Sequence, residues 1–166
     1  NSIAEASKNS NSSLQFQVHD MREKFDDQFD AIFNLFTSFG YFENDSDNLK
    51  TLIAIKESLT EHGFAVIDFM NVNQVIANLV PEETKTVEGI DFHIKRYVKD
   101  GHIYKEINFE DQGESYHFTE KVQALTLQDF QTMMEEAGIY LLDIFGDYKL
   151  KKFHKTDSER LIMIFK

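Results

Sequence analysis

Residues 29–41 read Phe29-Asp30-Ala31-Ile32-Phe33-Asn34-Leu35-Phe36-Thr37-Ser38-Phe39-Gly40-Tyr41, and this stretch decides the fold. The run from Ala31 to Phe36 is apolar except for Asn34, which is typical of a strand buried on both faces of a parallel sheet. Small and polar residues follow, and then Gly40. Because open α/β sheets bind ligands beyond the carboxyl ends of their strands, this order predicts a ligand site at Asn34. A core strand followed by an ordinary loop is the alternative interpretation.

The composition limits the class of protein. The chain has 166 residues, enough for one domain, and a formal net charge of -12, which disfavours nucleic acid as a partner. It has no cysteine, so disulfides, thiolate metal sites and cysteine nucleophiles are excluded. No apolar run approaches the roughly 20 residues of a membrane helix. The polar N-terminus has no signal-peptide pattern, so we expect a cytoplasmic protein with no membrane partner.

Further elements are predicted on both sides of the opening stretch. They are a short helix in residues 2–8, a strand at Leu14–Asp20, a helix from Asp45 or Ser46 to His62-Gly63, and a strand in residues 64–70. The strand, helix and strand between Ala31 and Met70 form a βαβ unit, which requires a parallel pair with a right-handed crossover. We therefore expect an α/β fold with a mainly parallel sheet.

The second half of the chain changes character. Residues 88–125 contain three segments with period-two alternation, separated by Asp100-Gly101 and Gln112-Gly113, and they predict an inserted antiparallel meander. A helix capped by Thr126 and ended by Gly138 follows. Residues 139–145 and 161–165 then predict two strands joined by a loop, which favours an antiparallel hairpin at the sheet edge.

Common catalytic devices are missing from the sequence. No two glycines have the spacing G-x-G, so neither a dinucleotide fingerprint nor a phosphate loop is present, and no G-x-S-x-G turn supports a nucleophilic serine. His93, His102 and His117 all fall in the predicted meander. They are either a metal cluster or, as we favour, ordinary half-exposed strand residues, and we predict no metal ligand.

Polar residues at two strand ends carry the chemistry that remains. Asp20 can accept a hydrogen bond from an exocyclic amine, and Met21 can pack on a flat ring. Asn34 and the backbone of Leu35 can hold an amine or a carboxylate, and Tyr41 can line a substrate pocket. The alternative for Asp20 is a capping role in a turn or helix.

The order of these motifs resembles a class I S-adenosylmethionine-dependent methyltransferase of the small-molecule type. The segment His19-Asp20-Met21-Arg22-Glu23 resembles the family's segment after its third strand, and residues 29–41 resemble its fourth strand and following loop. Residues 61–71 resemble the end of the preceding helix and the fifth strand, with His62-Gly63 where the family usually has Pro-Gly-Gly. Residues 126–138, Phe145-Gly146-Asp147-Tyr148 and residues 158–165 resemble the closing helix and strands. The resemblance covers nearly the whole chain.

The resemblance implies a Rossmann-like methyltransferase fold, methyl transfer to a small-molecule substrate, and S-adenosylmethionine as the cofactor. It implies that the cofactor is bound by Asp20, Met21, Asn34, Leu35 and Phe36. The meander in residues 88–125 is then expected to cover the substrate. The candidate substrate residues are Tyr41, Tyr97, Tyr104 and Tyr116.

One part of the family pattern is missing. The family begins with a strand and a glycine-rich loop that bends around the methionine part of the cofactor, and a second strand ends in an acid that binds the ribose. Neither motif occurs in this sequence, so residues 1–166 resemble a single, partial domain truncated at its N-terminus and inactive alone. An unpaired sheet edge predicts self-association. The alternative is a non-catalytic, methyltransferase-like interaction module or subunit.

Overall fold

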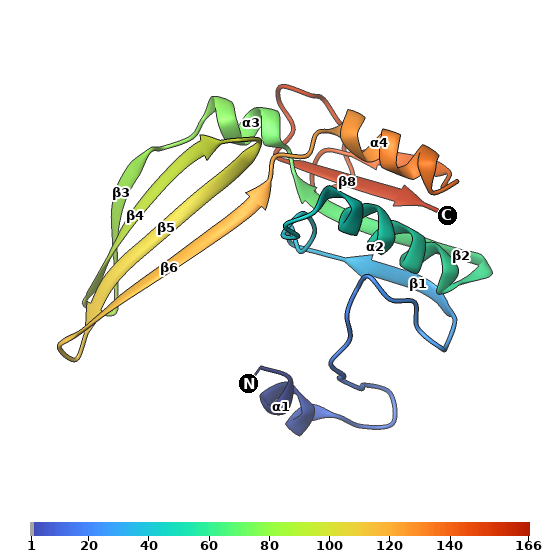
Figure 1. The fold of residues 1–166 in the computed structure, drawn as a ribbon, viewed down its shortest axis with the longest axis horizontal. Coiled ribbons are helices and arrows are strands. Elements are labelled where there is room, and N and C mark those ends of the chain that lie inside the picture. Colours follow the sequence, from blue (N-terminus) through green and yellow to red (C-terminus); the bar gives the residue numbers. More distant parts are fainter. Residues whose placement is uncertain (1) are drawn as a thin grey trace.

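The computed structural model describes residues 2–166, which form two four-stranded sheets (Figure 1). The strand orders are β1-β2-β8-β7 and β3-β4-β5-β6. The strands are β1 (Phe29–Asn34), β2 (Leu59–Met70), β3 (Glu82–Val87), β4 (Ile90–Lys99), β5 (His102–Asp111), β6 (Glu114–Gln123), β7 (Leu141–Phe145) and β8 (Arg160–Phe165). The helices are α1 (Ser2–Ala6), α2 (Asp45–Glu57), α3 (Val72–Ala77) and α4 (Leu127–Glu136), and a 3₁₀ helix, η1, spans Ser7–Asn9. No helix in the described residues is long and apolar enough to cross a membrane.

The predicted βαβ unit is confirmed in the first sheet. Strands β1 and β2 are parallel neighbours connected through α2, with Ile32 opposite Ala65 and Phe33 opposite Val66. Strand β8 lies between β2 and β7 and runs antiparallel to both, which confirms the antiparallel pairing of the last two strands. The expectation of a mainly parallel sheet is wrong for residues 2–166. Only the β1–β2 pair is parallel, because β7 and β8 are joined without a crossover helix.

Helix α2 is shorter than the sequence predicted. It begins after Asn44 as N-cap and ends at Glu57, whereas the predicted end was His62-Gly63. Gly63 instead lies inside β2, where an added Cβ atom would come 2.8 Å from the carbonyl oxygen of Phe29 in β1. Gly63 therefore lets two parallel strands approach each other and does not end a helix.

The strand predicted at Leu14–Asp20 is wrong. Only an isolated bridge between Asn11 and Leu14 is present, and the following residues are irregular. A strand needs a neighbour to complete its ladder of hydrogen bonds, and none of residues 2–166 supplies one for this segment. Val18 consequently stays 81% exposed. Figure 1 shows α1 and this segment below β1, apart from both sheets.

The meander has four strands, one more than predicted. Strand β3 pairs with β4, so the meander begins at Glu82, before residue 88. It was missed because charged and Thr side chains occupy most of β3 and leave no apolar alternation. The two predicted turns are confirmed. Asp100 and Gly101 have φ angles of 47° and 71°, the left-handed values that a tight hairpin between β4 and β5 requires.

Helices α2 and α4 lie over the same face of the first sheet (Figure 1). Phe130 of α4 is fully buried, and its ring centre lies 5.3 Å from those of both Phe39 and Phe69. Phe39 belongs to the loop after β1, and Phe69 lies near the end of β2. This aromatic group, Phe39, Phe69 and Phe130, therefore fixes the carboxyl edge of the sheet against α4.

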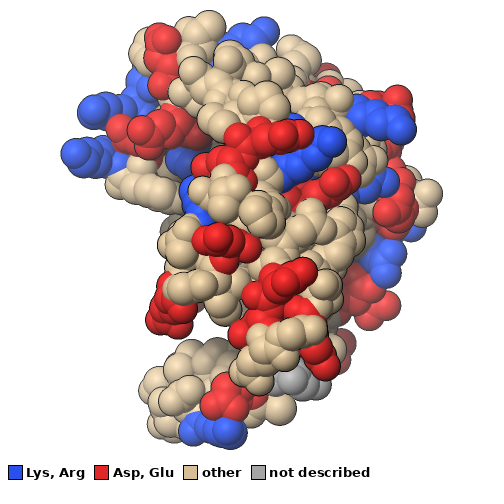
Figure 2. Space-filling view, turned by 90° about the vertical axis from the view of Figure 1, so that its left-hand side faces the viewer, with Lys and Arg blue, Asp and Glu red and all other residues tan. Residues whose placement is uncertain are grey.

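The meander extends from the first sheet as a single layer (Figure 1). At its base, Ile103 and Val122 are buried in the core shared with the first sheet. Farther out, Val87 and Phe118 are 55% and 53% exposed. Figure 2 faces this side of the molecule and shows acidic and basic side chains interspersed over it. The base of the meander is thus fixed, whereas its far end is exposed to solvent.

Candidate functional site

The loop after β1 has a strained backbone. Phe36 and Thr37 have φ angles of 58° and 59°, in the left-handed region that residues other than glycine rarely adopt. Such a conformation costs on the order of 1–3 kcal/mol per residue and persists only where other contacts enforce it. The backbone N–H of Phe36 donates to Oδ2 of Asp68 at 2.9 Å, and that of Thr37 donates to the Asp68 carbonyl oxygen at 3.0 Å. Strand β2 therefore holds the loop in this shape.

Asp68 is the centre of a buried polar network. Its side chain is only 1% exposed, and Arg160 Nε donates to its Oδ1 at 2.7 Å. The hydroxyl of Tyr148 donates to its Oδ2 at 3.0 Å. Burial and the bond to Asp68 raise the pKa of Tyr148, so this hydroxyl keeps its proton. Sequence reasoning missed the network, although Asp68 is the one charged residue in the apolar run of residues 64–70.

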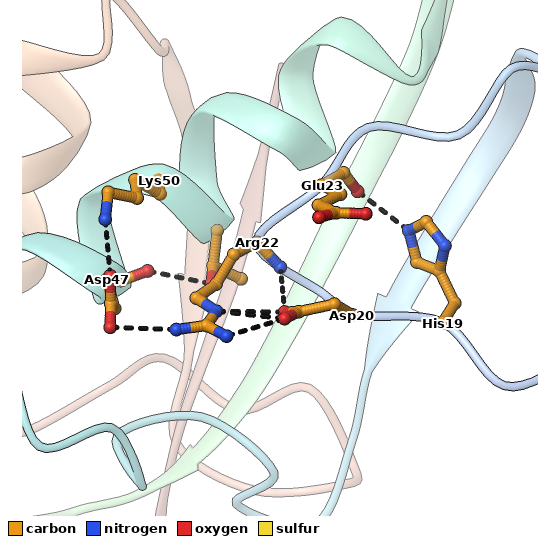
Figure 3. Close-up of polar contacts among 7 residues, drawn as sticks. His19, Asp20, Arg22, Glu23, Asp47 and Lys50 are labelled. Carbon is orange, nitrogen blue, oxygen red and sulfur yellow. Dashed lines mark hydrogen bonds and ion pairs between the residues drawn. The ribbon is translucent and has the colours of Figure 1, made fainter.

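Asp20 lies in a turn and not at the end of a strand (Figure 3). Arg22 binds its carboxylate through Nη2 at 2.6 Å and Nε at 3.0 Å, and the Arg22 backbone N–H also donates to Oδ1. Nη1 of Arg22 donates to Asp47 Oδ2 at 3.1 Å, at the start of α2. The turn-capping role that the sequence left open for Asp20 is therefore present, and it ties this turn to α2.

The charges of this cluster are strongly coupled. Hydrogen bonds from Arg22 lower the pKa of Asp20 from 3.8 to about 2. The pKa of Asp47 is lowered as well, first by its bond to Lys50 and then by Arg22. Both carboxylates are therefore ionised at neutral pH and can accept hydrogen bonds from a ligand or from Arg22.

We predict that Arg22→Gln returns the Asp20 pKa from about 2 towards 3.8, because Arg22 supplies the bonds that lower it. Because folding lowers the pKa of Asp20, the bonds between Asp20 and Arg22 stabilise the fold fully at pH values above the pKa of an unfolded Asp, near 3.9. This stabilisation is lost as the pH falls towards 2. A carboxyl-carbon NMR titration measures both values. Lys24→Gln is the matched control, because it removes a nearby charge that does not bond to Asp20. An unchanged midpoint in Arg22→Gln would contradict the assignment.

A pocket of about 300 Å³ lies between this turn, the end of β1 and the C-terminal end of α2. Met21, Phe33 and Asn34 line it. The side-chain oxygen of Asn34 is buried and accepts no hydrogen bond from any described residue. Because buried polar atoms are normally bonded, this free acceptor is available to a hydrogen-bond donor of a ligand. The structure thus brings Met21 and Asn34 to one pocket, as the sequence suggested.

The other predicted cofactor residues lie outside that lining. Leu35 and Phe36 follow β1 directly and are 38% and 75% exposed. Asp20 precedes Met21 in the turn but does not line the pocket either. Their roles as cofactor contacts stay predictions.

The four predicted substrate tyrosines are not gathered in one place. Tyr97 and Tyr104 lie opposite each other on β4 and β5, and their rings stack at 4.9 Å. Phe109 is an odd number of residues beyond Tyr104 on β5, so its side chain lies on the other face of the meander. Tyr116 lies opposite Phe109 on β6 and therefore shares that other face. Tyr41 lies beside the end of β6, because the backbone N–H of Gln123 donates to the carbonyl oxygen of the preceding Gly40 at 2.8 Å. Burial and the nearby Glu120 raise the pKa of Tyr41. A small substrate at one face could contact Tyr97 and Tyr104 together, but not Tyr116 as well.

The meander histidines do not form a metal cluster in the part of the chain that the structure describes. His117 bonds to Asn108 at 2.7 Å and to Thr119 at 3.1 Å. His93 bonds to Thr84 at 3.0 Å. The metal interpretation of these histidines therefore has no support in their geometry.

Solved structures similar to this chain include an S-adenosylmethionine-dependent methyltransferase and other methyltransferases. One, from Clostridium acetobutylicum, superposes with a TM-score of 0.78 at 19% identity, over 92% of this chain and 64% of its own. A methyltransferase from Streptomyces caelestis gives 0.75 at 11% identity, over 90% and 62%. A sugar N-methyltransferase from a Streptoalloteichus species gives 0.71 at 16% identity, over 98% and 66%. No family model and no curated protein matches the sequence.

These similarities establish the fold, which is the Rossmann-like methyltransferase fold that the sequence predicted. The chain spans 64% of the length of the first of these proteins.

Proposed function

We propose that this chain is part of an S-adenosylmethionine-dependent methyltransferase that acts on a small molecule. The observation that carries the proposal is the free, buried acceptor of Asn34, which lines a pocket beside Met21 at the carboxyl end of a parallel strand. In α/β sheets this edge is where ligands bind. The fold shared with known methyltransferases supports the same conclusion.

The chain's own residues would bind and orient the cofactor. The Asp20 carboxylate would accept a hydrogen bond from the adenine amine, in exchange for part of its contact with Arg22. Met21 would pack on the adenine ring, and Asn34 would accept a hydrogen bond from the cofactor through its free oxygen. Leu35 and Phe36, in the loop after β1, would contact the methionine end.

S-adenosylmethionine, when bound, supplies a methyl group on a positively charged sulfur. Met21, Asn34 and the loop after β1 would present this methyl group to a lone pair of the substrate, with the electron pair of the broken carbon–sulfur bond left on sulfur. A protonated nucleophile must then release its proton to water or to a base. Proximity and alignment carry most of the catalysis, so the chain's contribution is mainly to position the two reactants.

The substrate is proposed to be a small molecule with a nucleophilic nitrogen or oxygen. Two of the similar structures are described as a sugar N-methyltransferase and a glycopeptide N-methyltransferase, which fits such a substrate. The meander lies beyond the carboxyl edge of the first sheet, where it would cover the substrate. Tyr41 and the stacked pair Tyr97 and Tyr104 are then the better candidate contacts, and Tyr116 is the weaker one.

The free edge of β1 is proposed to pair with further strands of the same protein. Within residues 2–166, β1 has a neighbour only on its β2 side, and Phe33 is 56% exposed. An open edge with an exposed aromatic ring invites pairing. Self-association through this edge, in a non-catalytic module, is the second candidate. Sedimentation that shows a concentration-dependent dimer without cofactor binding would favour it.

Asn34→Leu tests the proposal directly. We expect affinity for S-adenosylmethionine or its demethylated product to fall about tenfold or more, because a bonded acceptor is lost. We expect stability to stay equal or rise, since a buried unbonded oxygen is removed. Calorimetric titration and thermal unfolding measure the two quantities. The experiment uses the protein together with any residues encoded upstream of residue 1, called the extended form below.

Asn108→Leu is the matched control, because Asn108 lies on the exposed far part of the meander. It should leave affinity unchanged. If Asn34→Leu and the unaltered protein bind the cofactor with equal affinity, Asn34 does not contact the cofactor. Absence of binding by the unaltered extended form would contradict the proposed function itself.

A further inference from the structure

One buried carboxylate collects donors from three separate segments of the chain. Oδ2 of Asp68 receives both the Phe36 N–H at 2.9 Å and the Tyr148 hydroxyl at 3.0 Å, and Oδ1 receives Arg160 Nε at 2.7 Å. These donors come from the loop after β1, the β7–β8 loop and the first residue of β8. The carboxylate therefore joins two loops at the carboxyl edge of the sheet.

Arg160 also bonds directly to the loop after β1. Its Nη2 donates to the Thr37 hydroxyl at 3.1 Å and to the Asp68 carbonyl oxygen at 3.4 Å. Phe36 and Thr37, the two residues with left-handed backbone, are thus each held by a side chain of this pair. The pair explains how the strained loop persists.

The fold does not need this pair in order to form its sheet. β2 and β8 are already paired through their backbones, from Ala65 opposite Phe165 to Met70 opposite Arg160. A buried ion pair is, moreover, weak evidence for stability, because apolar residues of similar volume often serve as well or better. The Asp68–Arg160 pair bonds to a strained loop, so the shape that it imposes on this loop explains its presence better than a contribution to stability does.

We infer that Asp68 and Arg160 are positioning residues that hold the loop after β1 in the shape that receives the methionine end of the cofactor, and that they anchor Tyr148 beside it. This inference rests on the proposed function. Phe36 and Tyr148 share one oxygen of Asp68, so the Tyr148 side chain lies next to the loop. Tyr148 as a whole residue is 62% exposed, and the Arg160 guanidinium lies 5.9 Å from the centre of its ring. The structure therefore assigns Tyr148 to the methyl-transfer end of the site, a role that the sequence did not give to the segment Phe145-Gly146-Asp147-Tyr148.

Backbone amide exchange tests the loop without any cofactor. Asp68→Asn, Thr37→Val and Tyr148→Phe each remove one or more of the bonds with little change in volume. We expect Asp68→Asn to speed exchange of the Phe36 amide by about tenfold or more, because its hydrogen bond to the Asp68 carboxylate weakens. The Thr37 amide bonds to the Asp68 backbone carbonyl, so its exchange should quicken only as far as the loop loosens. The Ile67 amide in the core of β2 reports global unfolding in the same spectra. If Asp68→Asn does not fold, Thr37→Val, which keeps the buried charges paired, gives the result.

Glu83→Gln is the matched control. It removes one partner of another ion pair, Arg96 to Glu83 at 2.6 Å, in the meander and away from the loop. It should change neither the exchange of the loop amides nor cofactor affinity.

Cofactor titration of the extended form separates a positioning role from a purely structural one. We expect Asp68→Asn to raise the cofactor Kd by about tenfold or more, and Thr37→Val to raise it less. Unchanged loop exchange in a folded Asp68→Asn protein would overturn the inference. Faster exchange with unchanged Kd would overturn the positioning role and leave the proposed function intact. An unaltered extended form whose loop amides exchange slowly but which binds no cofactor would overturn the proposed function. The finding that Asp68 and Arg160 hold the loop after β1 would remain.

Discussion

The 166-residue chain alone is expected to bind S-adenosylmethionine at least about a hundredfold more weakly than the extended form. The reason is that the described residues offer hydrogen-bonding groups for only part of the cofactor. Asp20, Met21 and Asn34 can serve the adenine and one polar group, but the sequence has no glycine-rich loop for the charged tail and no acid placed for the ribose. Losing two or three charge-assisted hydrogen bonds of about 1.5–3 kcal/mol each accounts for the expected loss.

Calorimetric titration of both forms with the cofactor and its demethylated product is the measurement. A form extended by an unrelated segment of equal length is the control for added mass and solubility. The upstream coding region gives an independent check, since an in-frame, acidic strand with a G-x-G motif is expected there. Micromolar binding by the 166-residue chain would mean that such a loop is dispensable. No binding by the extended form would favour the non-catalytic module.

The parallel core could be predicted from sequence because its signal is local. The apolar runs around Ile32 and Ile67, with an amphipathic helix between them, allow one right-handed arrangement. The Asp100-Gly101 turn was equally clear, because left-handed backbone at two successive positions favours Asp and Gly, and in the second turn Gly113 gave the signal. By contrast, Gly63 was misread, since a glycine after a helix and a glycine between close strands look alike in a sequence.

The failures concern features that depend on distant residues. Alternation at Leu14–Asp20 is a strand signal, but a strand forms only beside a partner, and residues 2–166 supply none. The Asp68 network joins residues up to 123 positions apart, from Thr37 to Arg160. No local pattern indicates such a contact. The one available signal was a charged residue in an apolar strand, which must be bonded when buried.

Of the candidate site, Met21 and Asn34 line one pocket, and their roles as cofactor contacts stay predictions, whereas the sequence could not place the tyrosines. Strand alternation puts side chains on opposite faces, so a one-residue difference in register decides which of them meet. Tyr104 and Tyr116 differ in this way, and only the pairing of β5 with β6 reveals it.

Phe130→Ala is expected to lower the free energy of unfolding by about 3–5 kcal/mol. Phe130 is fully buried, and its ring packs on both Phe39 and Phe69 at 5.3 Å between ring centres. Truncation leaves a cavity between α4 and the carboxyl edge of the first sheet, and the rigid sheet cannot close it. Since Phe39 belongs to the loop after β1, loosening should extend to the site, and amide exchange in residues 35–40 should quicken along with the loss of stability.

Urea unfolding followed by far-ultraviolet circular dichroism measures the change. Phe118→Ala is the matched control, because Phe118 is 53% exposed on the meander, and surface substitutions usually change stability by less than about 0.5 kcal/mol. The same residue type is thus truncated in both variants, and only burial differs. Equal losses in the two variants, or a loss below about 1 kcal/mol for Phe130→Ala, would show that α4 does not pack on the sheet through this aromatic group. The aromatic group would then not be what fixes the loop after β1 against α4.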